Sequence, residues 1–178
     1  MERAVEALRP GLARLNEATP QAARASLLRC CGSSRWAEEM ADRRPFSDAD
    51  ALLEAAATLW QGLDQADWRE AFAAHPKIGD LHSLRDKFAS TADLAVAEQA
   101  GVGTATEEVL TALARGNSAY EARFGYIYIV SAAGKSADEL LALLEARLGN
   151  EPGEETSIAA GEQQKITALR LEVLINAD

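Results

Sequence analysis

Only one stretch of this chain favours β structure, the aromatic and branched run at residues 123–130 (RFGYIYIV). A strand needs a neighbouring strand for its backbone hydrogen bonds, and the sequence offers no second run of this kind. We therefore expect residues 123–130 to form a buried helix or an extended loop inside the core. The rest of the chain has to fold from helices.

Capping residues, glycines and prolines divide the remaining chain into amphipathic helices. Thr19-Pro20 is a typical helix start, because the threonine hydroxyl can accept from free backbone N–H groups and proline suits the first helical position. Ser34 is expected to cap a short third helix in the same way. Together with apolar side chains at three- and four-residue steps, these signals predict eight or nine helices, at about residues 2–16, 20–31, 34–40, 48–62, 64–74 (started by Asp64 or Asp67), 91–100, 104–120, 136–148 and 154–175, with a helical turn at 84–88.

The length suits a single domain. A chain of 178 residues and 19.0 kDa can bury one real core but is short for two. Hydrophobic residues make up 48% and charged residues 26%, which is typical of globular proteins, and no repeat or long linker interrupts the pattern. We predict one compact all-α domain covering residues 1–178.

The charge balance argues against two classes of partner. Eighteen basic and 28 acidic residues give a net charge of −10, whereas nucleic acids and anionic membranes both reward clustered Lys and Arg. We therefore expect neither as a partner. A small anionic substrate would need individual cations close to its pocket to overcome this background.

The two cysteines and the chain ends predict a cytoplasmic protein. Cys30 and Cys31 are adjacent, a spacing that rarely forms a disulfide, and they are typical of a reducing compartment. No apolar run approaches the 18 residues that a membrane-spanning helix needs. The first residues lack the apolar core of a secretory signal, and the last ones are not a peroxisomal address.

The most chemically diverse short stretch is residues 75–80 (HPKIGD). His75 directly precedes Pro76, and the proline ring pushes such a residue out of the helical region. The preceding helix should therefore stop here and leave the imidazole on a loop, where chemistry tends to sit. By itself the stretch is equally well explained as a helix stop with a surface histidine.

Other possible motifs are weak. Gly134-Lys135-Ser136 resembles the end of a phosphate-binding loop, but a Walker A motif needs glycine at the position of Ile129. We interpret Gly134 as a helix stop and Ser136 as a cap. His75 and His82 are seven residues apart across a proline and a glycine, which is not a metal-ligand pattern, so we expect no metal site.

Three further polar residues are ordinary when taken singly. Glu98 and Gln99 lie near the end of an Ala- and Leu-rich helical segment, where most such side chains are simply solvated. Arg170 borders an apolar stripe of the last helix, where an arginine commonly extends its head to water. The members of that stripe are Ile158, Ile166, Leu169 and Val173.

Taken together, however, these residues resemble a known family. Their motifs occur in the order and approximate spacing of the OHCU decarboxylases, which act on 2-oxo-4-hydroxy-4-carboxy-5-ureidoimidazoline in urate breakdown. The resemblance covers nearly the whole chain. The main motifs are residues 75–79 (HPKIG), Glu98–Gly101, Tyr120-x-x-Arg123-Phe124-Gly125 and residues 165–171, supported by Ser34-x-Trp36, Arg44-Pro45-Phe46 and Arg147-Leu148-x-Asn150.

The resemblance implies a cofactor-free decarboxylation that gives (S)-allantoin and carbon dioxide, in an all-helical homodimer. It implies three catalytic residues. His75 suits a general acid or base because its pKa lies near neutrality. Glu98 can orient the imidazole or accept from substrate N–H groups, and Arg170 offers a planar fork of donors to a carboxylate or ring oxygen.

The resemblance also implies a set of substrate-binding residues. Gln99 can read an amide edge because it has both a donor and an acceptor. Pro76 sets the angle at which His75 leaves its helix, and the backbone of a later segment contacts the ureido end of the ligand. The full predicted set is Pro76, Gln99, Tyr128, Ile129, Val130, Ser131 and Ala132.

Two departures from the family pattern leave alternatives open. Ala95 stands where the family usually has serine, which removes one hydroxyl contact, and the aromatic run reads Phe124–Tyr128 (FGYIY) instead of Phe-Gly-Phe-Pro-Phe. One alternative is a related helical decarboxylase of another ureido or imidazolone acid. The other is a non-catalytic helical module that binds a partner.

Overall fold

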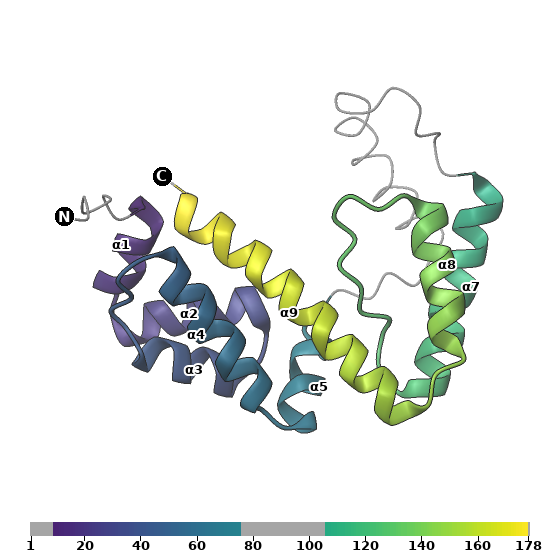
Figure 1. Cartoon of the computed structure of the whole chain (residues 1–178), viewed down its shortest axis with the longest axis horizontal. Helices are drawn as coiled ribbons and strands as arrows, with labels where there is room; N and C mark the ends of the chain where they lie inside the picture. The colour runs from purple at the N-terminus through teal and green to yellow at the C-terminus, as the bar shows by residue number, and fades with distance from the viewer. Residues whose placement is uncertain (1–8, 76–105, 178) are drawn as a thin grey trace, which may run out of the picture. The chain divides into compact units, whose positions relative to one another are not determined.

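The computed structural model describes residues 9–75 and 106–177 of the chain (Figure 1). All regular structure in these residues is helical, which confirms the all-α prediction. The described helices are α1 (Pro10–Glu17), α2 (Pro20–Cys31), α3 (Ser34–Asp42), α4 (Ala49–Gly62), α5 (Gln65–Ala73), α7 (Glu107–Phe124), α8 (Ala137–Leu148) and α9 (Pro152–Asn176). The helix predicted at 91–100 and the turn at 84–88 lie outside the described residues.

The chain divides into two compact units. The first contains the residues up to Ala74 together with those from Ala160 onward, and the second runs from His75 to Ala159. Helix α9 therefore contributes its first turns to the second unit and the rest of its length to the first. The prediction of one domain over residues 1–178 stays a prediction.

Most of the expected capping residues are in place. Thr19 Oγ1 accepts from the backbone N–H of Ala22 at the start of α2, and Asp64 caps α5. One prediction was wrong by a residue, because Ser33 rather than Ser34 caps α3. Ser34 bonds to α5 instead: its backbone N–H and its hydroxyl both donate to the Glu70 carboxylate, at 3.0 and 2.6 Å.

The core of the first unit is built around tryptophans whose indole N–H groups are satisfied. Trp36 on α3 is fully buried, and its Nε1 donates to the carbonyl oxygen of Ala56 on α4 at 3.1 Å. Trp60 on α4 donates in the same way to Ala160 on α9 at 2.9 Å. Because buried indoles need such a partner, these two bonds fix α4 against its neighbours.

The loop after α3 is tied to the end of α1. The Arg44 Nη1 donates to the carbonyl oxygens of Leu15 and Ala18, both at 2.7 Å, where a helix end leaves acceptors unsatisfied. Asn16 exchanges two hydrogen bonds with the backbone of Phe46, both at 2.9 Å. The Arg44-Pro45-Phe46 motif therefore has a structural role in the first unit.

A close approach of α1 to α9 requires glycine at position 11. A Cβ atom there would lie 2.1 Å from the carbonyl oxygen of Leu174 and 2.7 Å from the Cα of Ile175. We expect Gly11→Ala to lower the free energy of unfolding by about 1–3 kcal/mol, because the backbones must move apart. Urea denaturation measures this change.

A matched control exists on α9 itself. A Cβ at Gly161 would meet nothing within 4 Å, so Gly161→Ala is expected to raise the free energy of unfolding by about 0.5–1 kcal/mol through reduced backbone entropy. A Gly11→Ala variant as stable as wild type would contradict the close approach of α1 to α9 at this position.

The two cysteines behave as small apolar residues. Both thiols are free, and both side chains are buried on α2. Burial raises the pKa of the Cys31 thiol to about 11, so it stays protonated and unreactive near neutral pH. Their expected place as small residues in a helical segment is confirmed.

The second unit packs α7 against α8, which lie side by side (Figure 1). A Cβ at Gly116 on α7 would lie 2.5 Å from the Leu144 side chain of α8, so the small residue permits the contact. Residues 125–136 join the two helices and form no regular structure; Figure 1 draws them as a green loop. The run that favours β structure is therefore partly the end of α7 and partly an extended loop, the second of the two expected forms.

In helix α9 the apolar stripe predicted from the sequence is not the buried face. The expected stripe faces partly outward, because Leu169 is 46% and Val173 72% exposed. The buried residues instead include as many polar side chains as small or apolar ones. These residues are Glu155, Thr156, Ala159, Ala160, Gln163, Thr167, Leu171 and Ile175.

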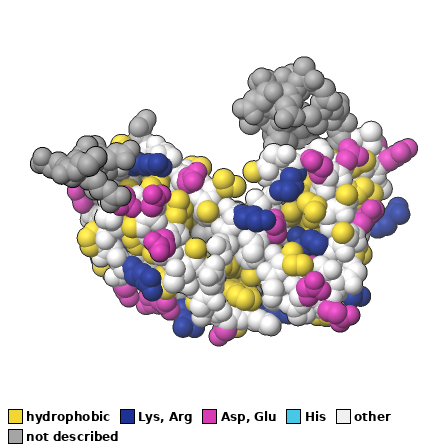
Figure 2. All heavy atoms as spheres, viewed as in Figure 1, with side chains coloured by type: hydrophobic (Ala, Val, Ile, Leu, Met, Phe, Trp, Pro, Cys, Tyr) yellow, Lys and Arg dark blue, Asp and Glu magenta, His cyan; other side chains and the backbone are white. Residues whose placement is uncertain are grey.

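The surface carries both signs of charge. On the face drawn in Figure 2, acidic and basic side chains are interspersed over the described residues. Within residues 9–75 and 106–177, no helix combines the length and apolar character that crossing a bilayer would require.

Candidate active site

The segment predicted to bind substrate is the best-defined part of the candidate site. It lies in residues 125–136, between α7 and α8, and begins at Gly125, whose φ of 79° ends α7 in the left-handed region that glycine favours. Ile129 and Ser131 are buried, whereas Tyr128, Val130 and Ala132 are half-buried. The segment leaves regular helix, so its backbone groups are not committed to a helical ladder.

Arg147 on α8 holds this segment from the inside. Its Nη1 donates to the carbonyl oxygen of Ile129 at 2.8 Å, and its guanidinium carbon lies 4.7 Å from the centroid of the Tyr128 ring. Nε and Nη2 donate to Oε1 of Glu155, the former at 2.8 Å. The planar fork thus bonds a carboxylate and a backbone carbonyl at the same time.

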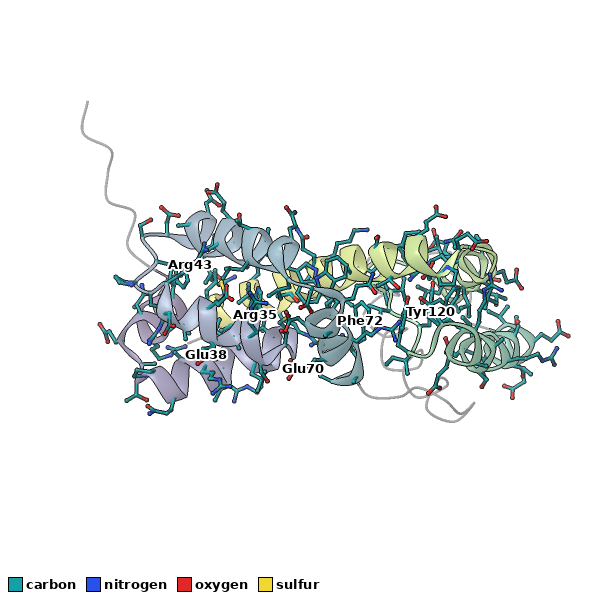
Figure 3. The ribbon with its side chains drawn as sticks, turned by 90° about the horizontal axis from the view of Figure 1, so that it is seen from below. Arg35, Glu38, Arg43, Glu70, Phe72 and Tyr120 are labelled. Carbon is teal, nitrogen blue, oxygen red and sulfur yellow. The ribbon has the colours of Figure 1, made fainter. Side chains whose placement is uncertain are left out.

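Glu155, in the first turns of α9, is the acceptor at the centre of this cluster. Its side chain is fully buried, yet Oε1 accepts from the Tyr120 hydroxyl as well as from Arg147, and Oε2 accepts from Asn150 Nδ2 at 2.9 Å. Figure 3 labels Tyr120 on α7. Arg123 extends the cluster, because its Nη2 donates to the Asn150 carbonyl at 3.0 Å.

The electrostatics of the cluster agree with this geometry. Burial and the hydrogen bond to Glu155 raise the pKa of Tyr120 well above its usual range. Burial opposes the charge of Arg147, but Glu155 and the neighbouring Tyr120 and Tyr128 together outweigh burial and raise the Arg147 pKa. The tyrosine therefore stays a neutral donor and the arginine stays charged.

The far end of the segment is fixed by a second cation and a cap. Lys135 Nζ donates to the carbonyl oxygen of Ser131 at 2.8 Å. Ser136 and Glu139 form a reciprocal capping box at the start of α8, and Gly134 turns the chain at a φ of 72°. The prediction that Ser136 caps a helix is confirmed, whereas the interpretation of Gly134 as a helix stop was wrong, because Gly125 ends α7 and Gly134 lies in the loop that follows.

His75 lies just beyond a helix end, as predicted. Helix α5 ends at Ala73, and Ala74 closes it, so the half-buried imidazole belongs to the connection that follows. Pro76, Glu98 and Gln99 lie outside the described residues, as does Ala95. Their roles stay predictions.

Arg170 is exposed on α9 in the first unit, near the end of α2. Its Nη1 lies 3.5 Å from the carbonyl oxygens of both Arg29 and Cys30, which are long contacts. These leave most of the fork for another acceptor. His75 and residues 128–132 belong to the second unit, so the assembly of all three into one pocket stays a prediction.

The sequence reasoning missed the central acceptor. Arg147, Asn150 and Tyr120 stood in the quoted motifs without a role, and Glu155 had no signal beyond its place in the first turns of a helix. Within the part of the chain that the structure describes, no group of three His, Cys, Asp or Glu side chains is arranged to hold a metal ion.

Comparison with known proteins gives a consistent picture. The model of the OHCU decarboxylase family matches residues 16–172. The Arabidopsis thaliana "Uric acid degradation bifunctional protein TTL" is 37% identical over 150 residues, which are 83% of this chain and 45% of that protein. The chain thus spans less than half of this relative's length.

A shorter relative and a solved structure match over most of their lengths. The "2-oxo-4-hydroxy-4-carboxy-5-ureidoimidazoline decarboxylase" of Haloferax volcanii is 29% identical over 139 residues, 78% of this chain and 80% of that protein. A "Crystal structure of OHCU decarboxylase in the presence of (S)-allantoin" is similar with a TM-score of 0.71 and 32% identity, covering 90% of this chain and all of that one. The chain belongs to the OHCU decarboxylase family.

Proposed function

We propose that this protein decarboxylates 2-oxo-4-hydroxy-4-carboxy-5-ureidoimidazoline to (S)-allantoin in urate breakdown. The observation that carries the proposal is the family match across residues 16–172. It is supported by relatives named for this activity or for uric acid degradation and by a similar structure determined in the presence of (S)-allantoin.

The reaction needs little from the protein besides binding, orientation and proton delivery. The bond to the carboxylate breaks, carbon dioxide leaves, and the electron pair passes into the imidazoline ring system, which accepts it without an added cofactor. A proton then adds to one face of the ring. A site for this reaction must hold an anion and protonate stereospecifically.

The candidate residues supply these functions in the proposed mechanism. His75 serves as the general acid or base, with Glu98 orienting its imidazole or accepting from substrate N–H groups. Arg170 binds a carboxylate or ring oxygen with its fork, and Gln99 reads an amide edge. The backbone of residues 128–132 binds the ureido end; its support is that the segment leaves helical structure and is held in a fixed conformation.

A single assay tests the activity. The unstable urate-derived intermediate is generated in situ, and the circular dichroism of the product is followed. Rapid formation of (S)-allantoin is the expected result. Slow racemic decay equal to the buffer control would contradict the proposal and favour another ureido or imidazolone acid, or a non-catalytic module.

Arg170→Lys tests the role of the exposed arginine on α9. We expect kcat/KM to fall roughly 10- to 100-fold, because a point charge does not replace two parallel donors to an oxyanion. Arg24→Lys, at an exposed position on α2, is the control and should keep the wild-type value. An unchanged kcat/KM in Arg170→Lys would remove Arg170 from the site.

The protein is further proposed to act as a homodimer in the cytoplasm. Leu169 and Val173 expose apolar surface on α9 that a second copy could remove from water. The two free, buried thiols suit a reducing compartment. Light scattering of the purified chain measures the oligomeric state.

A further inference from the structure

We propose that Arg147 and Glu155 are positioning residues for substrate binding, because they fix the backbone of residues 128–132. The inference rests on the proposed function of that segment. It assigns a role beyond packing to the Glu155-centred cluster (Tyr120, Arg147, Asn150 and Glu155). Arg147 donates to the carbonyl of Ile129, and Glu155 accepts from Arg147 and holds it in place.

The first argument is the division of the guanidinium between two acceptors. One edge, Nε and Nη2, faces Glu155, and the remaining nitrogen, Nη1, reaches the Ile129 carbonyl. Rotation of the guanidinium would break the bonds on the Glu155 side, so the position of Nη1 is set by the carboxylate. Glu155 thereby determines where the Ile129 carbonyl is held, although it is in another element.

The second argument is that the carboxylate is itself immobile. Glu155 is fully buried on the first turns of α9 and accepts from groups on α7, α8 and the connection before α9. Each further donor removes rotational freedom from the carboxylate and satisfies one of its lone pairs. Through Arg147 and the Glu155 carboxylate, the segment is therefore anchored to α7, α8 and the connection before α9.

The third argument is that stability alone is a poor reason for this cluster. A buried ion pair contributes little relative to well-packed apolar residues of the same volume, because both charges must be desolvated. What apolar residues cannot supply is a directed donor for the Ile129 carbonyl. The Arg147 guanidinium also lies over the Tyr128 ring, so two neighbouring residues of the segment are held by one side chain.

The test separates the bond to Glu155 from the bond to the segment. In Arg147→Lys the charge beside Glu155 is kept, but one ammonium cannot reproduce the planar fork that reaches both acceptors. We expect KM for the ureidoimidazoline substrate to rise about tenfold, the loss of roughly one hydrogen bond, with kcat within about twofold of wild type. This split is expected because the segment is proposed to bind the ureido group, which is not the group that leaves.

A second readout needs no substrate. Hydrogen exchange of the peptide covering residues 125–136 is expected to accelerate in Arg147→Lys, while exchange in α7 and α8 stays as in wild type. Leu110→Ala on α7 is the first control: it opens a cavity in the core and lowers the Tm, but it removes no hydrogen bond of Arg147 or Glu155. Arg35→Lys, an exposed arginine paired with Glu39 on α3 of the first unit, is the second. Both should keep the wild-type KM and segment exchange.

The outcomes are distinct. Faster segment exchange together with a raised KM in Arg147→Lys alone supports the proposal. Unchanged exchange would overturn it, as would faster exchange with an unchanged KM. An equal rise of KM in Leu110→Ala would also overturn it, by showing that lost stability suffices. A wild-type protein that forms no (S)-allantoin would refute the proposed function and the substrate-binding part of this inference. The hydrogen-exchange measurement would still test whether Arg147 fixes the backbone of residues 125–136.

Discussion

His75→Ala is expected to fold like the wild-type protein and to lose decarboxylation by about 10²–10⁴-fold, the usual contribution of a positioned general acid or base. The residue lies beyond the end of α5 and outside the helices, so removal of its imidazole should not disturb a helical ladder. An imidazole can both release and accept a proton at working pH, because the ordinary pKa of histidine side chains lies near neutrality.

The measurement follows (S)-allantoin by circular dichroism with the substrate generated in situ. The far-ultraviolet spectrum and the Tm report whether the variant is folded. His82→Ala, which changes the other histidine of the chain, is the matched control and should retain the wild-type rate. Wild-type activity in His75→Ala would eliminate its catalytic role while leaving the family membership untouched.

Arg147→Met is expected to lower the free energy of unfolding by about 3–5 kcal/mol, because it leaves the Glu155 carboxylate buried without its cation. The two side chains are 9% and 0% exposed, so water cannot take the place of the guanidinium. The Ile129 carbonyl also loses its donor. For a protein of ordinary stability this loss removes a large part of the total.

Urea denaturation, followed both by far-ultraviolet circular dichroism and by tryptophan fluorescence, measures this loss. Arg35→Met is the control, since Arg35 forms ion pairs with Glu39 and Asp67 but is 55% exposed (Figure 3). Exposed pairs contribute about 0–1 kcal/mol, so its midpoint should barely move. Equal effects of the two substitutions would show that the Arg147 pair is not a buried one.

The fold class could be predicted because local signals decide it. A lone β-favouring run without a partner excluded a sheet, and caps such as Thr19, Asp64 and Ser136 act within their own first turn. The error at α3 has a tertiary origin. Ser33 and Ser34 are adjacent hydroxyls of equal capping ability, and the choice between them depends on Glu70, which is far away in sequence.

The orientation of α9 could not be predicted for a different reason. Periodicity ranks faces by apolar content, and the stripe through Leu169 and Val173 scores well on that measure. The face that is buried includes Glu155, which is acceptable in a core only because other elements supply its partners. Those partners are tertiary contacts, so no pattern within the helix reveals them.

The residues of the candidate site also differ in whether local sequence signals could reveal them. His75 could be singled out because a His-Pro helix stop has unusual local chemistry, whereas residues 128–132 were selected only through the resemblance to the family. Arg170 was selected only through its motif. Glu155 was not selected at all, because an acidic residue in the first turn of a helix usually complements the helix dipole at the surface.

The hydrogen bonds of the Glu155 carboxylate constrain which substitutions relatives of this protein can accept. Tyr120, Arg147 and Asn150 all donate to it, so a substitution at any one position leaves an orphaned charge or donor at the others. Single replacements should therefore be eliminated by selection and joint ones tolerated. The four positions are expected to vary together among relatives, and a chain that has exchanged all four for apolar residues would be a natural test of whether residues 128–132 can bind substrate without them.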